Sequence, residues 1–368
     1  MLVEGKHFHT IWISPSDEII VEIIDQRHLP HQFIVEKLTT VEDCHVAIRD
    51  MHVRGAGCIG ATAAYGMYLS LLNLDKSQDL EYELNRDAEL LLSARPTAVN
   101  LQHAVEHMHS FFSSGSDLID LRSTFKQAAI DYAQQDILAC QAIGQHGLGI
   151  LQERFAATQD VVNILTHCNA GWLAFVDHGS ATAPIYAAHD AGIPVHVWVD
   201  ETRPRNQGAA LTVWELEQHG VPCSLIPDNT GGHLMQRGLV DMVIVGSDRT
   251  TASGDVCNKI GTYLKALAAF DNQIPFYAAM PSSTIDWTIH NGLSIPIEER
   301  DTDEIKYVEG WIEDSPGKVL ITTPGAKAVN YAFDVTPARL VTGIITERGL
   351  CKPNRQDLAA MYPDQAHD

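Results

Sequence analysis

The stretch VVNILTHCNAGWLAFVDHGSATAPIYAAHDAGIPVHVWVDE, residues 161–201, indicates how this chain folds. A short apolar run ends at Thr166, small residues and a helical pattern follow, and a second run rich in valine covers 195–201. A strand, a helix and a strand with short connections favour a parallel pair with a crossover helix. Cys168 lies where the first strand ends, a position that suits a reactive thiol or a small buried residue.

The same alternation continues along the second half of the chain. Apolar runs of strand type recur at 223–228, 240–248 and 274–280, and helical patterns lie between them. We therefore predict an α/β fold in which a doubly wound parallel sheet occupies residues 156–368. The preceding part, residues 1–155, has short apolar runs followed by long helical patterns and predicts a smaller mixed β/helical domain.

The composition excludes several classes of protein. The chain has 368 residues, 45% of them apolar, and a formal net charge of -22, which disfavours nucleic-acid binding. We find no signal peptide and no apolar run long enough to span a membrane. Seven scattered cysteines without C-x-x-C spacing are typical of reduced thiols in a cytoplasmic protein and do not predict a structural zinc site.

Polar residues follow five of the predicted strands. Ligands of such sheets bind beyond the carboxyl ends of the strands. We expect these side chains to form one rim there: Cys168, Glu201, Arg203, Gln207, Asp228, Asp248 and Arg249. Two further arginines precede predicted helices: Arg54 in VRGAGCIGATAAYG and Arg95 in ARPTAVNLQHA. Each arginine suits an anion site at a helix start. The alternative for the first segment is a glycine-rich helix that packs tightly on a neighbour, and the alternative for Arg95 is a surface arginine.

The segment VIVGSDRTTASGDVCNKIGTY, residues 243–263, carries the largest number of candidate groups. Asp248 follows an apolar strand, and burial there would raise its pKa and make it a usable proton donor. The alternative is a strand-end ion pair with Arg249. We expect Asn258 and Lys259 to open the next helix, where Lys259 can reach a phosphate.

The helical segment HAVEHMH, residues 103–109, offers a rival interpretation. His103, Glu106 and His107 match the H-x-x-E-H pattern of a metalloprotease helix. No third ligand stands out downstream. A helix with exposed histidine and glutamate accounts for the pattern better.

Taken together, these segments resemble the methylthioribose-1-phosphate isomerase family from about Arg54 to about Gly349. The matching pieces, in chain order, are VRGA, RPTAVNL, THCNAG, ETRPRNQG, GSDR, NKIGTY, IPIEER and NYAFDVTP. The wider family includes ribose-1,5-bisphosphate isomerases and regulatory subunits of a translation-initiation exchange factor.

The resemblance implies a Rossmann-like C-terminal domain, a homodimer, and conversion of an aldose 1-phosphate to a ketose 1-phosphate in methionine salvage without a metal or nucleotide cofactor. By motif, Cys168 and Asp248 are the catalytic pair. The residues implied to bind the sugar and its phosphate are Arg54, Gly55, Ala56, Arg95, Gln207, Asn258 and Lys259.

Residues beside the implied site depart from the usual family pattern at Gly57, Cys58, Ser247 and Ser253. These departures leave two substrates open, methylthioribose 1-phosphate and 5-deoxyribose 1-phosphate, because an apolar pocket discriminates weakly against a smaller group. The route is also open between a hydride shift and an enediol-type transfer. A non-catalytic sugar-phosphate or nucleotide-binding subunit is the alternative class, but such a subunit has no need of both Cys168 and Asp248.

Overall fold

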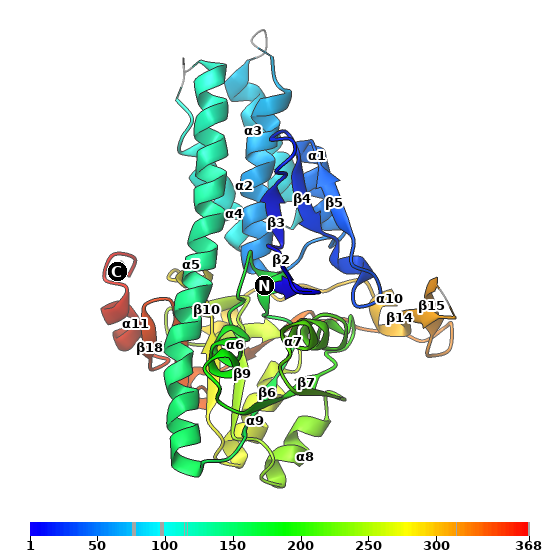
Figure 1. Cartoon of the computed structure of the whole chain (residues 1–368), viewed down its shortest axis with the longest axis vertical. Helices are drawn as coiled ribbons and strands as arrows, with labels where there is room; N and C mark the ends of the chain where they lie inside the picture. Colours follow the sequence, from blue (N-terminus) through cyan, green and yellow to red (C-terminus); the bar gives the residue numbers. More distant parts are fainter. Residues whose placement is uncertain (76–78, 96–98, 114, 116, 314, 367–368) are drawn as a thin grey trace.

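The structure is a computed structural model that describes residues 1–75, 79–95, 99–113, 115, 117–313 and 315–366. Figure 1 shows an elongated molecule with helices and a small sheet at one end and a large sheet at the other. The long helix α5, Leu118–Thr158, runs along both parts. No helix of the described residues is both long and apolar enough to cross a membrane.

The N-terminal part packs around helix α2, Ala56–Asn73, of which nearly every residue is buried. A helix that is apolar on all sides must be covered on all sides. Its neighbours are a three-stranded antiparallel sheet of β3, β4 and β5 (Ile11–Ile13, Val21–Ile24, Val35–Leu38) and the helices α1, α3, α4 and α5. Helices α1, α3 and α4 span Val41–Arg49, Leu80–Ala94 and Val99–His109.

The C-terminal part contains a seven-stranded sheet in the order β18-β17-β12-β9-β6-β7-β8. Its strands are Gly349–Cys351, Gly343–Thr346, Phe276–Ala279, Met242–Val245, Val162–Thr166, Val195–Asp200 and Cys223–Ile226. All neighbours pair in parallel except β18 with β17. The six parallel strands, numbered by chain order, follow the pattern 3-2-1-4-5-6 of the Rossmann fold, which confirms the predicted fold class.

The crossover helices complete the layers of this part. They are α6 (Ala183–Asp190), α7 (Val213–His219), α8 (Thr230–Gln236) and α9 (Thr262–Asp271), and helix α11 (Arg355–Met361) follows the last strand. Helix α7 continues directly from a π-turn over Gly208–Thr212. Pi-turns of this kind occur often at functional sites.

Two further sheets were not predicted from the sequence. One is four-stranded, in the order β13-β10-β11-β16, with strands Ile285–Asp286, Arg249–Thr251, Val256–Lys259 and Phe333–Thr336. The other is the hairpin of β14 (Tyr307–Ile312) and β15 (Ser315–Leu320), which follows the short helix α10, Asp303–Lys306, and extends away from the body in Figure 1.

The division at residue 155/156 stays a prediction. It falls within the last turn of α5, which packs against α2 in one part and against α6 and β17 in the other. The first residues also reach across, because β1 (Leu2–Val3), which pairs with β2 (Lys6–His7), packs against α7.

Candidate active site

The point at which the strand order reverses collects reactive side chains from distant parts of the chain. Ligands of doubly wound sheets bind at this switch point. Here it lies between β6 and β9, and Cys168 follows the first of these strands while Asp248 follows the second. The turn before α2 adds Arg54, whose Nη2 lies 3.9 Å from Cys168 Sγ.

The backbone of Cys168 is fixed from both sides. Its amide donates to Thr202 Oγ1 at 2.8 Å, and its carbonyl accepts from Thr212 Oγ1 at 2.7 Å. The residue is buried and has a φ of 69°, a left-handed conformation that is uncommon for a side chain with a Cβ. Two threonines from the end of β7 and the π-turn therefore set the direction in which the thiol points.

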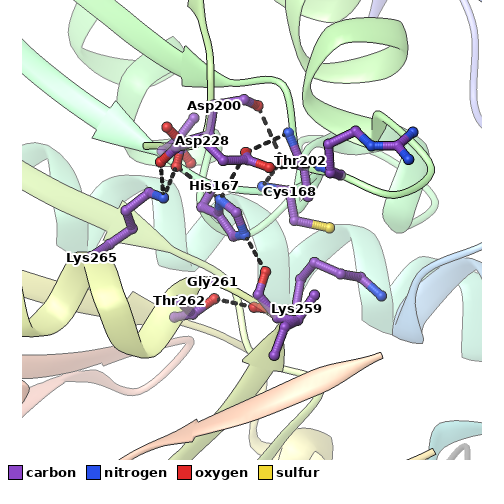
Figure 2. A network of polar contacts seen from close by, with 12 residues as sticks. His167, Cys168, Asp200, Thr202, Asp228, Lys259, Gly261, Thr262 and Lys265 are labelled. Carbon is purple, nitrogen blue, oxygen red and sulfur yellow. Dashed lines mark hydrogen bonds and ion pairs between the residues drawn. The ribbon is translucent and has the colours of Figure 1, made fainter. Parts of the chain in front are cut away.

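A buried polar network holds the strand ends around Cys168 together (Figure 2). His167 Nδ1 lies 2.8 Å from Asp200 Oδ2, and His167 Nε2 lies 2.8 Å from the carbonyl oxygen of Ile260. Lys265 donates to Asp200 at 3.1 Å and also to the carbonyl of Asp228. The end of β6 is thus linked to the end of β7 and to the turn before α9.

The same network fixes the loop that carries Gln207. The carboxylate of Asp228 accepts from the backbone amides of Thr202 and Arg203 at 2.7 and 2.8 Å. As expected of neighbouring strand residues, the imidazole of His167 is engaged in this network and does not serve Cys168 as a base.

Lys259 does not open a helix, contrary to the sequence-based expectation. Asn258 and Lys259 are the last residues of β11, which pairs with β16, and α9 begins only at Thr262 after Gly261 at a φ of 104°. The left-handed backbone of Gly261 is not helical, and a Cβ there would lie 3.0 Å from His167 Nε2, so the position favours glycine.

Lys259 nevertheless reaches the site. Its ammonium lies 4.6 Å above the ring centre of Phe333, and Figure 2 shows it on the same side of the network as the sulfur of Cys168. Burial lowers the pKa of Lys259, whereas Cys168 and Asp248 favour its charged form. Its neighbour Asn258 is buried and donates to Thr262 Oγ1 at 3.0 Å.

Asp248 lines a pocket between the two parts of the chain. Its carboxyl remains accessible to solvent within that pocket, and its amide donates to the carbonyl of Cys257 at 2.9 Å. Desolvation by the surrounding protein raises the pKa of Asp248, and the charges of Lys259, Arg54 and Arg95 act in the opposite direction. A carboxyl in this setting is suited to donating a proton.

Arg54, Gly55 and Ala56 form the predicted turn into α2, which begins at Ala56. Gly55 has a φ of 87°, and a Cβ there would lie 2.4 Å from Ala174, so only glycine fits. Gly55 and Ala56 line the pocket of Asp248. The guanidinium of Arg54 points to the end of β6, where it donates to Asn169 Oδ1 at 2.8 Å.

Arg95 also lines the pocket of Asp248, and its Nη2 lies 3.7 Å from Glu298. Residues 96–98, which include the predicted helix-opening Pro96, lie outside the described residues. The side chain of Arg95 is largely buried, so Arg95 is not the surface arginine of the alternative interpretation.

Gln207 and Arg54 line a second cavity of about 710 Å³, which is bounded on its far side by the β14–β15 hairpin. Among the described residues, the buried Oε1 of Gln207 has no hydrogen-bond partner. A buried amide oxygen without a partner is costly, which is characteristic of a group that meets a ligand.

Not every residue of the predicted rim faces a ligand. Arg203 donates to the carbonyl of Ile305 at 2.8 Å, and Arg205 pairs with Glu304 at 3.1 Å, so both hold α10 against the rim. Arg249 lies 3.4 Å from Asp286 but also lines the pocket of Asp248. Asp228 serves the backbone, as described above.

The metalloprotease interpretation gains no support. Among the described residues, the groups of side chains close enough to hold a metal together do not include His103, Glu106 or His107. One such group does lie in the site, His167 with Asp200 and Asp228. The ammonium of Lys265 already contacts the carboxylate of Asp200 and the backbone carbonyl of Asp228, and the carboxylate of Asp228 accepts from two backbone amides.

Sequence reasoning missed the residues that form or hydrogen-bond the turn carrying Cys168, chiefly Asn169, Thr202, Thr212 and Glu215. A faint signal was available for Glu215, because a carboxylate in the apolar segment TVWEL falls on the buried face of α7. A buried carboxylate requires several donors, and only the structure shows which groups supply them.

The model of the initiation factor 2 subunit family matches residues 52–353. A curated relative from Desulfatibacillum aliphaticivorans, a methylthioribose-1-phosphate isomerase, is 55% identical over 99% of this chain and 100% of its own. A second relative of that name, from Methylorubrum extorquens, is 54% identical over 99% of both chains.

Solved structures give the same picture. The crystal structure of 5-methylthioribose 1-phosphate isomerase from Pyrococcus horikoshii has a TM-score of 0.86 and 37% identity, over 98% of this chain and 97% of that one. Translation initiation factor eIF-2B, subunit delta, from A. fulgidus has a TM-score of 0.82 and 33% identity, over 97% of this chain and 100% of that one.

Proposed function

Since this chain belongs to the initiation factor 2 subunit family, we propose that it is an aldose–ketose isomerase that converts S-methyl-5-thioribose 1-phosphate to S-methyl-5-thioribulose 1-phosphate in methionine salvage. The reaction is supported by relatives named methylthioribose-1-phosphate isomerase, which are more than 50% identical to this chain over nearly its full length. The observation that carries the proposal is that Cys168 and Asp248 follow the two strands of the switch point. Both groups favour the charged form of the Lys259 ammonium.

The phosphate is assigned to the cationic and amide groups around these two residues. Guanidinium and ammonium groups form charge-assisted hydrogen bonds to phosphate oxygens, and helix-start amides favour anions. The groups proposed for sugar and phosphate are Arg54, Gly55, Ala56, Arg95, Gln207, Asn258 and Lys259. Gly55, Ala56 and Arg95 line the pocket of Asp248, Arg54 and Gln207 line the second cavity, and Asn258 and Lys259 end β11.

Asp248 is proposed to begin the reaction. It donates its proton to the ring oxygen as the bond from that oxygen to C1 breaks, which opens the sugar. A hydrogen then moves from C2 to C1, and the hydroxyl at C2 passes its proton back to the carboxylate of Asp248 as the ketone forms. In a hydride shift the hydrogen moves with its electron pair and Cys168 polarises C1 and C2. In an enediol-type route the thiolate of Cys168 takes the C2 proton and returns it to C1.

Apolar residues that line the Asp248 pocket favour a substrate with an apolar C5 group. They are Ile59, Val99, Ile295, Pro296 and Phe333. A methylthio group buries more apolar surface against them than a hydrogen does, and one such group is worth about 1–3 kcal/mol. We propose 5-deoxyribose 1-phosphate as a second, weaker substrate.

An isomerisation assay with both aldose 1-phosphates tests the proposal. The ketose is followed by ¹³C NMR for the wild type, Cys168→Ala and Asp248→Asn, with Cys351→Ala on the edge strand β18 as the control. We expect turnover of methylthioribose 1-phosphate that both site variants lower by roughly 10²–10⁴-fold and the control leaves unchanged. Turnover that survives in Cys168→Ala contradicts the role of the thiol.

A non-catalytic binding subunit is the second candidate, because the structure named as a subunit of an initiation factor shares this fold at 33% identity. Tight binding of either sugar phosphate by calorimetry without turnover would favour it. The homodimer and the cytoplasmic location are proposals that rest on the family alone, and light scattering of the purified protein tests the first.

A further inference from the structure

A buried glutamate lies behind the turn that carries Cys168. Glu215, in α7, is fully buried, and its two carboxylate oxygens accept from four donors. Oε1 accepts from Asn169 Nδ2 at 3.0 Å and from the amide of Leu173 at 2.9 Å. Oε2 accepts from the amide of Trp172 and from the hydroxyl of Tyr186, each at 3.1 Å. Three of these donors belong to the turn itself.

The turn is shaped to close around this carboxylate. A Cβ at Gly171 would lie 1.6 Å from Glu215 Oε2, so only glycine allows the contact. Thr212, one helical turn before Glu215, accepts from Asn169 Nδ2 at 3.2 Å and donates to the carbonyl of Cys168. Helix α7 therefore holds the turn through its side chains.

Asn169 passes this contact on to Arg54. Its Nδ2 faces Glu215, while its Oδ1 accepts from Arg54 Nη1 at 2.8 Å and its carbonyl accepts from Arg54 Nη2 at 3.0 Å. The same Nη2 lies 3.9 Å from Cys168 Sγ. Arginine has five N–H groups, and the two contacts with Asn169 orient its planar fork. The amide of Asn169 can accept from Arg54 only if its Nδ2 faces the carboxylate.

We propose that Glu215 is a positioning residue that sets the guanidinium of Arg54 against Cys168 and the substrate phosphate, acting through the amide of Asn169. This role rests on the proposed function only in the identity of the substrate, because the chain of contacts from Glu215 to Arg54 holds for any anionic ligand at this site. Within the described part of the chain, the hydrogen-bond partners of Glu215 are Asn169, Trp172, Leu173 and Tyr186, and neither Cys168 nor Asp248 is among them.

The protonation state of Glu215 depends on its burial, on its hydrogen-bond donors and on the charge of Arg54. Burial raises its pKa to about 7, and its four donors and the charge of Arg54 favour the ionised form. Tyr186 faces it from α6, and the amino group of Met1 interacts with it from the N-terminus. As the pH falls through that value the carboxylate gains a proton, one donor loses its acceptor, and the orientation of Asn169 is no longer enforced.

The test compares Glu215→Gln with Glu217→Gln, which removes the same charge two residues further on the exposed side of α7. We expect Glu215→Gln to lower kcat/KM by about 10-fold or more, mainly through KM, and Glu217→Gln to leave it unchanged. The acid side of the wild-type pH profile should disappear in Glu215→Gln. A role limited to fold stability would leave the shape of that profile as it is.

A double-mutant cycle then shows whether the effect passes through Arg54. Arg54→Lys should lower kcat/KM much less in the Glu215→Gln background than in the wild type. We expect the two fold-losses to differ by at least about fivefold. If Glu215→Gln does not fold, Asn169→Ala takes its place, since it removes the bridging amide and leaves the other three donors of Glu215. Additive losses in the cycle, or full activity of folded Glu215→Gln, would overturn the inference.

The same cycle is measured as binding of inorganic phosphate by calorimetry. Coupling between Glu215 and Arg54 in phosphate affinity supports the inference even if no aldose 1-phosphate is turned over, in which case only the proposed function fails. Turnover by the wild type with additive effects in both cycles leaves the proposed function standing and removes the role of Glu215.

Discussion

Cys168 combines a proposed catalytic role with a strained backbone. A left-handed conformation costs a residue with a Cβ about 1 kcal/mol or more, and here two threonine hydroxyls hold it in place. Strain of this kind persists where the surroundings over-determine the conformation, as they do at the end of β6.

Replacing Cys168 separates these two properties. We expect Cys168→Gly to be about 1 kcal/mol more stable than Cys168→Ala, because glycine accepts a positive φ without strain, while both variants lose activity. Denaturant unfolding of the two proteins gives the difference. Equal stabilities would mean that the backbone at this position is relaxed.

Asp248 should give the reaction its alkaline limit. A proton donor acts only while protonated, and since desolvation by the surrounding protein raises its pKa, Asp248 keeps its proton to higher pH than an ordinary aspartate. We therefore expect kcat/KM to fall as the pH rises through the raised pKa. Asp248→Asn should remove this limb together with most of the activity; a pH profile that keeps its alkaline limb in the residual activity would assign the limb to another group.

The positions of Cys168 and Asp248 beyond neighbouring strand ends could be predicted from the sequence because each comes shortly after an apolar strand. Asn169 and Glu215 could not, since their roles depend on contacts between segments more than 40 positions apart. Gln207 was predicted on its motif, and the structure adds that its amide oxygen lies buried beside a cavity.

At the scale of elements, strands with a long apolar run were predicted well and short polar ones were not. β11 ends in Asn258-Lys259 and pairs with Phe333–Thr336, far along the chain. Nothing local distinguishes such a strand from the start of a helix, because its pairing partner defines it.

Two glycines of α5 provide a matched test of how this helix packs. A Cβ at Gly147 would lie 2.3 Å from Pro184 Cγ in α6, whereas a Cβ at Gly149 would meet nothing within 4 Å. Gly149→Ala should stabilise the protein by about 0.5–1 kcal/mol through helix propensity. Gly147→Ala should destabilise it by about 1–3 kcal/mol through overpacking. Thermal unfolding of both variants decides; two stabilised proteins would mean that α6 shifts freely.

At the scale of the whole molecule, the site draws on both parts of the chain. Arg54 and Arg95 come from the helical part, and Cys168, Asp248 and Lys259 come from the part with the large sheet. The parallel sheet could be predicted from its alternation. Its order, and the way α5 joins the two parts, depend on packing between distant segments.

A ligand that contacts both parts should therefore slow motion at their junction. With Cys168→Ala and saturating methylthioribose 1-phosphate, we expect amide hydrogen exchange at residues 53–58 to slow, because the anion engages the start of α2. Helix α11 serves as the internal control and should not change. Equal exchange with and without ligand in the first segment would exclude the start of α2 from binding.

The strand order also has a consequence for the growing polypeptide on the ribosome. β6 is synthesised first among the parallel strands but lies in the middle of the finished sheet, with β7 on one side and β9 on the other. After β7 and β8 have emerged, the opposite edge of β6 stays unpaired until Met242–Val245 has been translated. An unpaired apolar strand edge invites association between chains. The nascent chain therefore exposes an aggregation-prone strand edge from the synthesis of β6 until β9 has been translated, and that is the interval in which a chaperone would protect it.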